Sequence, residues 1–283
     1  MTNTVVRLAG RTWQLGPGPA IMGILNVTPD SFSDGGQFAS ADRAVAHGLA
    51  MVEAGADLID VGGESTRPGA TPVPLDEELA RVVPVVRELA RRTPVLLSID
   101  TRNARVARAA VDAGAHIVND VSGLRHDADM LAVVRGTGAA CVAMHMRGTP
   151  ATMQTLTDYA DVVVDIHAFF RQTLDMAEAA GVSHECILLD PGIGFGKTAR
   201  QSLQILHGLE RFADLGRPLV VGVSRKSFIG KTLGLERPAD RQWGTAAAVA
   251  VAAYNGAHVL RVHDVREMKQ VAEMAAALRD ANV

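Results

Sequence analysis

The sequence has few of the residues that mark secreted, membrane-spanning or nucleic-acid-binding proteins. It contains two cysteines and 4% aromatic residues, and its 28 basic and 31 acidic side chains give a net charge of −3. Cys141 and Cys186 both open apolar runs, so we expect core thiols in a reducing, cytoplasmic compartment. The charge balance predicts no nucleic-acid partner. The longest strongly apolar stretch, 246–253, is too short to cross a bilayer, and no signal-peptide pattern begins the chain, so we expect no membrane partner.

What the sequence does contain is a short apolar run, repeated eight times, that ends each time on polar or charged residues. Continuous apolar runs are typical of strands buried on both faces of a parallel sheet. The runs are 21–25, 58–61, 95–99, 117–118, 141–144, 187–189, 219–223 and 259–260. Helical patterns occupy 41–55, 76–92, 103–113, 127–137, 158–180, 200–214, 240–254 and 265–280. Eight strand–helix units predict an α/β fold, the (β/α)8 TIM barrel, with reactive groups gathered where the strands end.

We expect one domain over residues 1–283, because no long linker or charge block interrupts the repeats. It would comprise an N-terminal flap at 1–20, a barrel core at 21–264 and a C-terminal helix at 265–283. Residues 11–13 are predicted to lie in a hairpin arm of the flap. The segments 27–40 and 62–75 are long strand-to-helix loops, and loops of this length often serve as lids.

The predicted helix at 240–254 has almost no polar face from residue 244 onward. A barrel helix should be apolar on one stripe and polar outside, so an all-round apolar helix must be covered on both sides. We therefore expect a subunit interface there and a homodimer. The alternative is that the helix at 265–280 covers this surface within the same chain.

Three planar polar side chains, Asp100, Asn119 and Asp190, lie at the ends of apolar runs. Carboxylate and amide groups form paired hydrogen bonds in one plane, so together they suit the edge of a flat heterocycle. The alternative is that each residue caps the following helix.

A cationic group follows the last two runs, with Arg225 and Lys226 between Ser224 and Ser227, and Arg261 close to His263. The loops after the last two strands of such barrels often bind phosphate. Lysine and arginine supply charge-assisted donors for it. The alternative, a solvated basic face, fits poorly because these residues directly follow apolar strands.

Asn26 is a candidate magnesium ligand, because Mg²⁺ often takes one or two protein oxygens together with waters and substrate phosphates. The glycine-rich run at 192–197 lacks the spacing of a Walker motif and more plausibly lets backbone approach a ligand closely. His145 is either a site residue or a satisfied residue of the barrel wall.

Several motifs in fixed order make the chain resemble the dihydropteroate synthase family over residues 21–264. They are GILNVTPDSFSDGG at 23–36, DVGGESTRPG at 60–69, SIDT at 98–101, NDVSG at 119–123, MHMRG at 144–148, DPGIGFGK at 190–197, SRKS at 224–227 and RVHD at 261–264. The resemblance implies a transferase of folate biosynthesis that joins a pterin methyl diphosphate to 4-aminobenzoate, giving 7,8-dihydropteroate and diphosphate. It also implies sulfonamides as inhibitors.

The resemblance assigns roles to individual residues of this chain. Pterin binding falls to Asp100, Asn119, Asp190 and Lys226, and the diphosphate and Mg²⁺ to Arg261, His263, Asn26 and Thr66. The 4-aminobenzoate side is lined by Thr66, Arg67, Pro68, Phe195, Ser227 and Phe32. Catalytic roles are implied for Asp190, Lys226, Arg261 and His263.

The chemistry favours a dissociative, magnesium-assisted reaction in which diphosphate leaves before the arylamine attacks. Three rival functions remain open at this stage. A pterin-dependent methyltransferase would have no use for the cationic cluster, and an aldolase-type barrel would use Lys226 as a Schiff-base nucleophile. A catalytically silent pterin-binding protein would not turn over.

Overall fold

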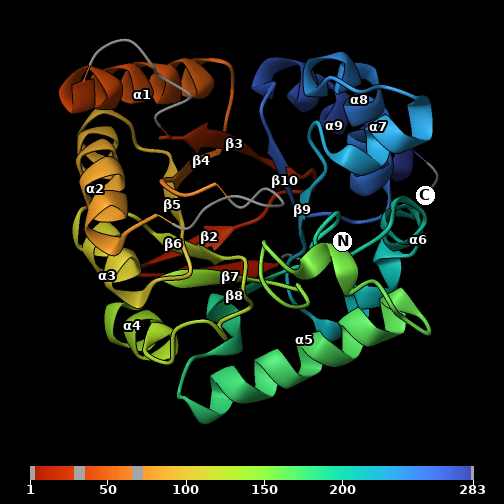
Figure 1. Cartoon of the computed structure of the whole chain (residues 1–283), viewed down its shortest axis with the longest axis horizontal. Helices are drawn as coiled ribbons and strands as arrows, with labels where there is room; N and C mark the ends of the chain where they lie inside the picture. The colour runs from red at the N-terminus through yellow and green to blue at the C-terminus, as the bar shows by residue number, and fades with distance from the viewer. Residues whose placement is uncertain (1–3, 29–35, 66–72, 282–283) are drawn as a thin grey trace.

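A computed structural model describes residues 4–28, 36–65 and 73–281 of the chain, and its centre is a sheet of eight parallel strands (Figure 1). All eight apolar runs of the sequence lie in or beside these strands. Their bounds are β3 (Ala20–Asn26), β4 (Leu58–Gly62), β5 (Leu96–Asp100), β6 (Ile117–Asp120), β7 (Ala140–Met144), β8 (Ile187–Asp190), β9 (Val220–Gly222) and β10 (Val259–Val262).

The strands run in the order β8-β7-β6-β5-β4-β3-β10-β9, so each pair of neighbours is consecutive along the chain except where β10 returns to β3. One parallel bridge between Leu189 and Leu219 joins the two ends of the sheet at β8 and β9. The sheet is therefore a nearly closed barrel, and the predicted (β/α)8 fold is confirmed.

Helices surround the barrel on the outside (Figure 1). They are α1 (Gly36–Glu53), α2 (Leu75–Arg92), α3 (Ala104–Asp112), α4 (Met130–Thr137), α5 (Val162–Ala179), α6 (Ala199–His207), α7 (Ser227–Leu233), α8 (Gln242–Tyr254) and α9 (Val265–Asp280). Short 3-10 turns are η2 (Met153–Thr155), η3 (His184–Cys186), η4 (Leu209–Leu215) and η5 (Pro238–Arg241).

Several helix boundaries differ from the sequence expectation. Helix α1 begins at Gly36 rather than at residue 41, so residues 36–40 belong to a helix and not to the loop expected at 27–40. Helix α4 begins at Met130 rather than at residue 127. Helix α5 begins at Val162 rather than at residue 158, because the Asp161 carboxylate caps the first turn by accepting from the amides of Val163 and Val164. The helix expected at 200–214 ends at His207, and η4 follows Gly208. Helix α7 was not predicted. It contains Gly230, where a Cβ would lie 2.4 Å from the Leu235 carbonyl oxygen, so a poor helix former is required inside it.

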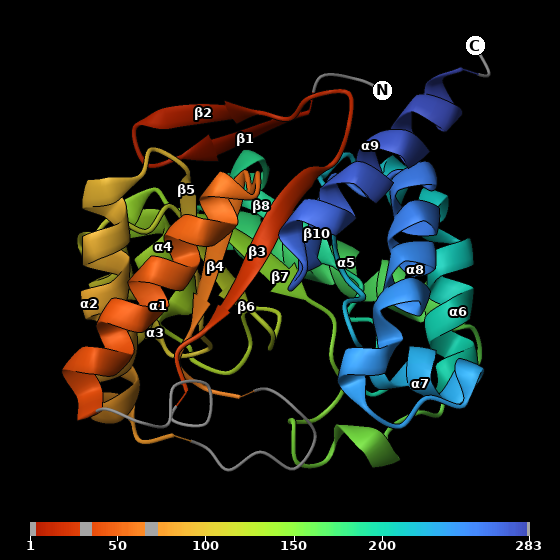
Figure 2. The same cartoon turned by 90° about the horizontal axis from the view of Figure 1, so that it is seen from above.

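The expected hairpin arm is confirmed as β1 (Val5–Leu8) and β2 (Arg11–Gln14), paired antiparallel. Figure 2 shows it lying across one end of the barrel. Val6, Leu8 and Leu15 pack against residues at the starts of the barrel strands, including Met22 and Leu58. The hairpin thus closes the amino-terminal end of the barrel, and the opposite end remains for ligands.

Helix α8 lies beside α9 (Figure 2), and the two are packed along each other. Val249 is fully buried within the chain, whereas Val251 is 44% exposed and Trp243 is 83% exposed. The intrachain alternative therefore accounts for one side of α8, and the other side faces outward with apolar residues. Within the described ranges, no helix is both long enough and apolar enough to span a membrane.

Candidate functional site

The polar residues at the strand ends gather at the carboxyl-terminal mouth of the barrel. Asp100 and Asp190 are the last residues of β5 and β8, and Asn119 is the penultimate residue of β6. All three are buried, with 4–7% of each residue exposed. Burial of polar side chains at this depth is costly unless partners are present, so their partners define the site.

Arg261 links the buried carboxylates of the mouth. Its Nε donates to Asp60 Oδ2 at 2.6 Å and its Nη2 donates to Asp100 Oδ2 at 2.7 Å. Asn119 Nδ2 donates to the same Asp60 oxygen at 2.9 Å. Among the described residues, the buried Oδ1 atoms of Asp60 and Asp100 have no hydrogen-bond partner. Asp100 can therefore still accept a hydrogen bond from a molecule in the mouth.

Two glycines, Gly62 and Gly222, lie next to these side chains at the mouth. A Cβ at Gly62 would lie 3.7 Å from Asp100 Oδ2 and 3.8 Å from Asn26 Oδ1. A Cβ at Gly222 would lie 3.6 Å from Lys226 Nζ and 3.8 Å from Arg261 Cβ. Asn26 and Asp100 thus share one side of the mouth, and Lys226 and Arg261 share another.

Burial changes the proton affinity of the two terminal aspartates. It raises the pKa of Asp100 to about 7, with a further rise from Asp60 and an opposing effect of Arg261. It also raises the pKa of Asp190, while Lys226 and the Gly192 amide favour the charged form. Asp190 Oδ1 accepts from that amide at 2.7 Å, so one of its oxygens is fixed by the loop that follows β8.

Lys226 reaches the mouth from the N-cap of α7. Its Nζ donates to the Ile193 carbonyl and lies 4.7 Å from the centre of the Phe195 ring. Burial lowers the pKa of Lys226 to about 8, and Asp190 opposes this fall. Lys226 and Phe195 therefore form one wall of the site, as a cation over an aromatic face.

Ser227 begins α7 after β9, and His263 directly follows β10. His263 Nδ1 and the Ser224 hydroxyl are 2.9 Å apart, and the His263 amide donates to the same hydroxyl at 3.2 Å. Ser227 is exposed at the first position of α7. Arg225 has a left-handed φ of 59° and pairs with Asp264 rather than with the mouth.

Asn26, the predicted magnesium ligand, is the last residue of β3 and is partly exposed at the mouth. In the described parts of the chain, no cluster of three or more His, Cys, Asp or Glu side chains could hold a metal by itself. An amide oxygen beside Asp100 does fit Mg²⁺ that takes its remaining ligands from water and substrate phosphate. Phe32, Thr66, Arg67 and Pro68 lie outside the described residues.

Two residues of the site were not singled out from the sequence. Asp60 lies inside the apolar run 58–61. An ionisable residue in a strand that is buried on both faces needs a partner, and this could have identified Asp60 as a site residue. Lys197 ends the glycine-rich run, and no sequence pattern marked its burial. His145 is 3% exposed and its Nδ1 lies 2.9 Å from Lys197 Nζ, so it belongs to the wall behind the mouth.

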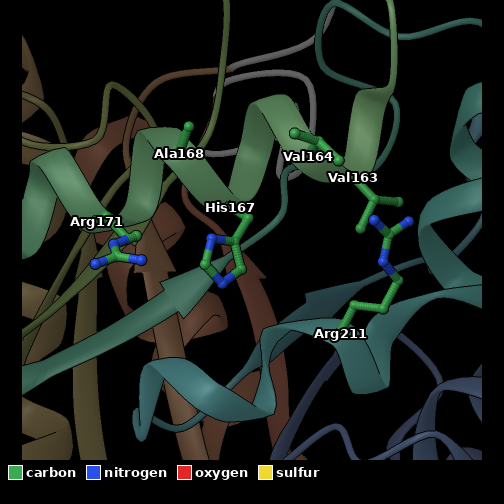
Figure 3. Close-up of a pocket in the computed structure, with 6 residues that line it drawn as sticks. All are labelled: Val163, Val164, His167, Ala168, Arg171 and Arg211. Carbon is green, nitrogen blue, oxygen red and sulfur yellow. The ribbon is translucent and has the colours of Figure 1, made fainter.

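A separate surface hollow of about 480 Å³ lies on the outer side of α5 (Figure 3). Val163, Val164 and Ala168 line it together with His167, Arg171 and Arg211. These side chains come from α5 and η4, and they include none of the residues at the strand ends. The chemistry of the protein is therefore assigned to the mouth and not to this hollow.

The fold and the mouth define a barrel enzyme that combines buried carboxylates with closely held cations. The sequence matches the family described as pterin binding enzyme over residues 22–263. It is 50% identical over 258 residues to the dihydropteroate synthase of Synechocystis sp., covering 91% of this chain and 89% of that one. The chain belongs to the dihydropteroate synthase family, whose members are transferases of folate synthesis. The resemblance read from the motifs is thereby confirmed.

Solved structures agree with this assignment over nearly the whole chain. The dihydropteroate synthase of Xanthomonas albilineans with 4-aminobenzoic acid has a TM-score of 0.90 and 46% identity, covering 98% of this chain and 99% of that one. The Yersinia pestis dihydropteroate synthase in a sulfonamide drug complex has a TM-score of 0.90 and 44% identity, with the same coverage.

Proposed function

We propose that this protein condenses (7,8-dihydropterin-6-yl)methyl diphosphate with 4-aminobenzoate at the mouth of the barrel, releasing 7,8-dihydropteroate and diphosphate. The observation that carries the proposal is the placement of Asp100, Asn119 and Asp190 beside Arg261 and Lys226. Hydrogen-bonding groups for a flat heterocycle and cations for a diphosphate thus meet at one place.

The pterin is proposed to lie with its polar edge against Asp100, Asn119 and Asp190. The unpartnered Asp100 Oδ1 supports this position, because a pterin N–H can donate to it. Lys226 donates from the opposite wall, where its ammonium lies over Phe195.

The diphosphate is proposed to lie between Arg261, His263 and Asn26, with Thr66 contributing from its loop. Mg²⁺ held partly by Asn26 would neutralise charge on the leaving diphosphate. Arg261 is already oriented for this role, because Asp60 and Asp100 fix its guanidinium at two nitrogens. His263 is held in place by the Ser224 hydroxyl.

The reaction is proposed to be dissociative. The bond between the methylene carbon and oxygen breaks first, and the diphosphate takes the electron pair. Asp190, if ionised, stabilises the positive charge that develops on the pterin, and the arylamine nitrogen then forms the new bond to carbon and releases a proton. The segments that connect β3 to α1 and β4 to α2 are proposed to exclude water, which would otherwise capture the cation.

The 4-aminobenzoate is proposed to bind between Phe195 and Ser227, with Phe32, Thr66, Arg67 and Pro68 supplied by the two loops. Sulfonamides share the aniline ring and are proposed to compete for this place. The partly exposed Phe195 ring, next to Lys226, supports an aromatic ligand here.

A homodimer built on the outward side of α8 is proposed as the working form. Trp243, Val251 and the α9 residue Met274 support this, because they leave large apolar surfaces exposed on neighbouring helices. A cytoplasmic location is proposed from the two free cysteines, Cys141 and Cys186.

The test is a single assay that combines the protein, the pterin diphosphate, Mg²⁺ and 4-aminobenzoate. We expect dihydropteroate and diphosphate in equal amounts. Asp190→Asn should keep the fold and lose turnover by on the order of 10²-fold or more, because it removes a charge from the transition state. Turnover without Mg²⁺ at the full rate would contradict the metal's role. Near-normal turnover in Asp190→Asn would remove that carboxylate from the mechanism.

A further inference from the structure

Lys197 is a buried lysine that the proposed reaction does not use. It ends the loop between β8 and α6 and is only 4% exposed. Its Nζ donates to the carbonyl oxygens of Gly192 and Phe195, each at 2.9 Å. It also lies 3.2 Å from the His145 carbonyl oxygen and 2.9 Å from His145 Nδ1.

Four possible acceptors surround Lys197 Nζ, namely the carbonyl oxygens of Gly192, Phe195 and His145 and the His145 Nδ1. Burial lowers the pKa of Lys197 well below its ordinary range, while Asp190 opposes that fall. Burial and the Lys197 charge lower the pKa of His145 to about 2, so the imidazole is neutral and accepts through Nδ1. The Lys197 amino group therefore donates to acceptors of both the loop and the residue that follows β7.

The loop is pressed closely against the end of β7. Gly192 has a φ of 64°, and a Cβ there would lie 2.0 Å from the His145 carbonyl oxygen. The Gly192 amide also holds Asp190 Oδ1 at 2.7 Å. Without the Lys197 amino group, the buried carbonyls of Gly192, Phe195 and His145 would face one another with no donor between them.

The same loop carries two contacts to Lys226 on the other side. The Ile193 carbonyl accepts from Lys226 Nζ, and the Phe195 ring lies 4.7 Å from it. Phe195 therefore has its carbonyl bound by one lysine and its ring packed against the other.

We propose that Lys197 is a positioning residue that fixes the β8–α6 loop to the end of β7, and thereby holds Phe195 against Lys226 at the 4-aminobenzoate side of the mouth. This inference rests on the proposed function for its kinetic consequence. It does not rest on that function for its structural consequence.

The first test replaces Lys197 with methionine, which keeps the apolar stem as far as Cε and removes every donor. We expect the KM for 4-aminobenzoate to rise on the order of 10-fold or more, because a small displacement of a binding wall is enough for such a loss. The matched control is Thr198→Ala. Thr198 caps α6 through the Gln201 amide and lies on the adjacent, exposed position. It should lower the melting temperature and leave the KM unchanged.

The second test is a double-mutant cycle with Phe195→Ala. If Lys197 acts through Phe195, Lys197→Met should change the KM little once the ring is absent. If the rise in KM in the double variant equals the product of the rises in the two single variants, the two residues act independently and the proposal is overturned. An unchanged KM in Lys197→Met with only a lower melting temperature would also overturn it.

The third test is amide hydrogen exchange of the segment 191–197, which needs no activity. Exchange should be faster in Lys197→Met than in the wild type and in Thr198→Ala. If wild type makes no dihydropteroate, the proposed function fails and this comparison still decides the anchoring role. If Lys197→Met does not fold, Lys197→Gln retains two donors and carries the same measurements. Glutamine is one atom shorter than lysine and has one donor fewer, so exchange of 191–197 should still be faster and the KM higher than in the wild type. Wild-type values of both in Lys197→Gln would overturn the proposed anchoring by the lysine.

Discussion

Asp60 and Arg261 lie 201 positions apart in the chain and are joined by a hydrogen bond of 2.6 Å between Oδ2 and Nε. The same oxygen accepts from Asn119, so side chains from β4, β6 and β10 meet at one atom. Asp60 is fully buried and cannot reach a ligand itself. Its influence must therefore pass through the orientation of Arg261 and Asn119.

Replacing Asp60 with asparagine should weaken pterin diphosphate binding and leave 4-aminobenzoate binding nearly unchanged. The amide keeps the shape but loses the charge-assisted bonds that orient Arg261, and such bonds are about twice as strong as neutral ones. We expect the KM for the pterin substrate to rise roughly 10-fold. Steady-state kinetics with each substrate varied in turn measures this. Asp57→Asn is the control, because Asp57 bonds to the Ile21 amide at the other end of β4. An equal rise in both variants would show that Asp60 has no specific role at the mouth.

The activity should fall as the pH rises through about 8, the value to which burial lowers the pKa of Lys226. Below that pH the ammonium is charged and can donate to the pterin, and above it this donor is lost. Deprotonation of Lys226 does not lower the activity by destabilising the fold. Between pH 8 and its ordinary pKa of 10.5, Lys226 binds more protons in the unfolded chain, so its contribution to stability rises with pH. The kcat/KM for the pterin substrate should be measured from pH 6 to 10. In Lys226→Arg, the remaining activity should no longer fall as the pH rises through about 8. If the fall persists in this variant, another group causes it.

Glutamate substitutions at Val249 and Val251 should separate folding from assembly. Val249 is fully buried inside the chain, so an unpaired charge there should cost several kcal/mol and lower the melting temperature. Val251 is 44% exposed on the outward side, so Val251→Glu should leave the monomer folded and disrupt the dimer. Sedimentation and thermal melts of both variants measure this. A wild type that sediments as a stable monomer would contradict the proposed interface.

Sulfonamides should compete with 4-aminobenzoate, and two loop variants should alter that competition. Pro68 and Phe32 lie outside the described residues, so the prediction comes from the sequence alone. A proline at position 68 would restrict the backbone of its segment, and a phenylalanine at position 32 would offer a flat apolar ring. Pro68→Ser and Phe32→Leu should raise the inhibitor constant more than the KM of the compact substrate. The ratio of the two constants is the measurement, and an unchanged ratio in both variants would place these residues elsewhere.

The sequence predicted the strands and their polar ends because both depend on local pattern. A strand buried on two faces must be apolar throughout, and the barrel brings the ends of such strands together, as Asp100, Asn119 and Asp190 show. The sequence could not predict hydrogen bonds between side chains of strands that are distant in the chain. No local pattern marked Asp60 as a partner of Arg261 or Lys197 as a buried donor to three carbonyls.

The barrel is joined between β8 and β9 by a single parallel bridge, whereas other neighbouring strands pair over three to five residues. Asp190 ends one of these strands and Lys226 follows the other, so the two walls of the proposed pterin site lie on either side of this junction. A substrate that binds both residues would connect β8 to β9, which share few backbone hydrogen bonds. A ligand that binds only when β8 and β9 are paired stabilises that pairing. Ligand binding should therefore reduce local opening of the barrel between these two strands.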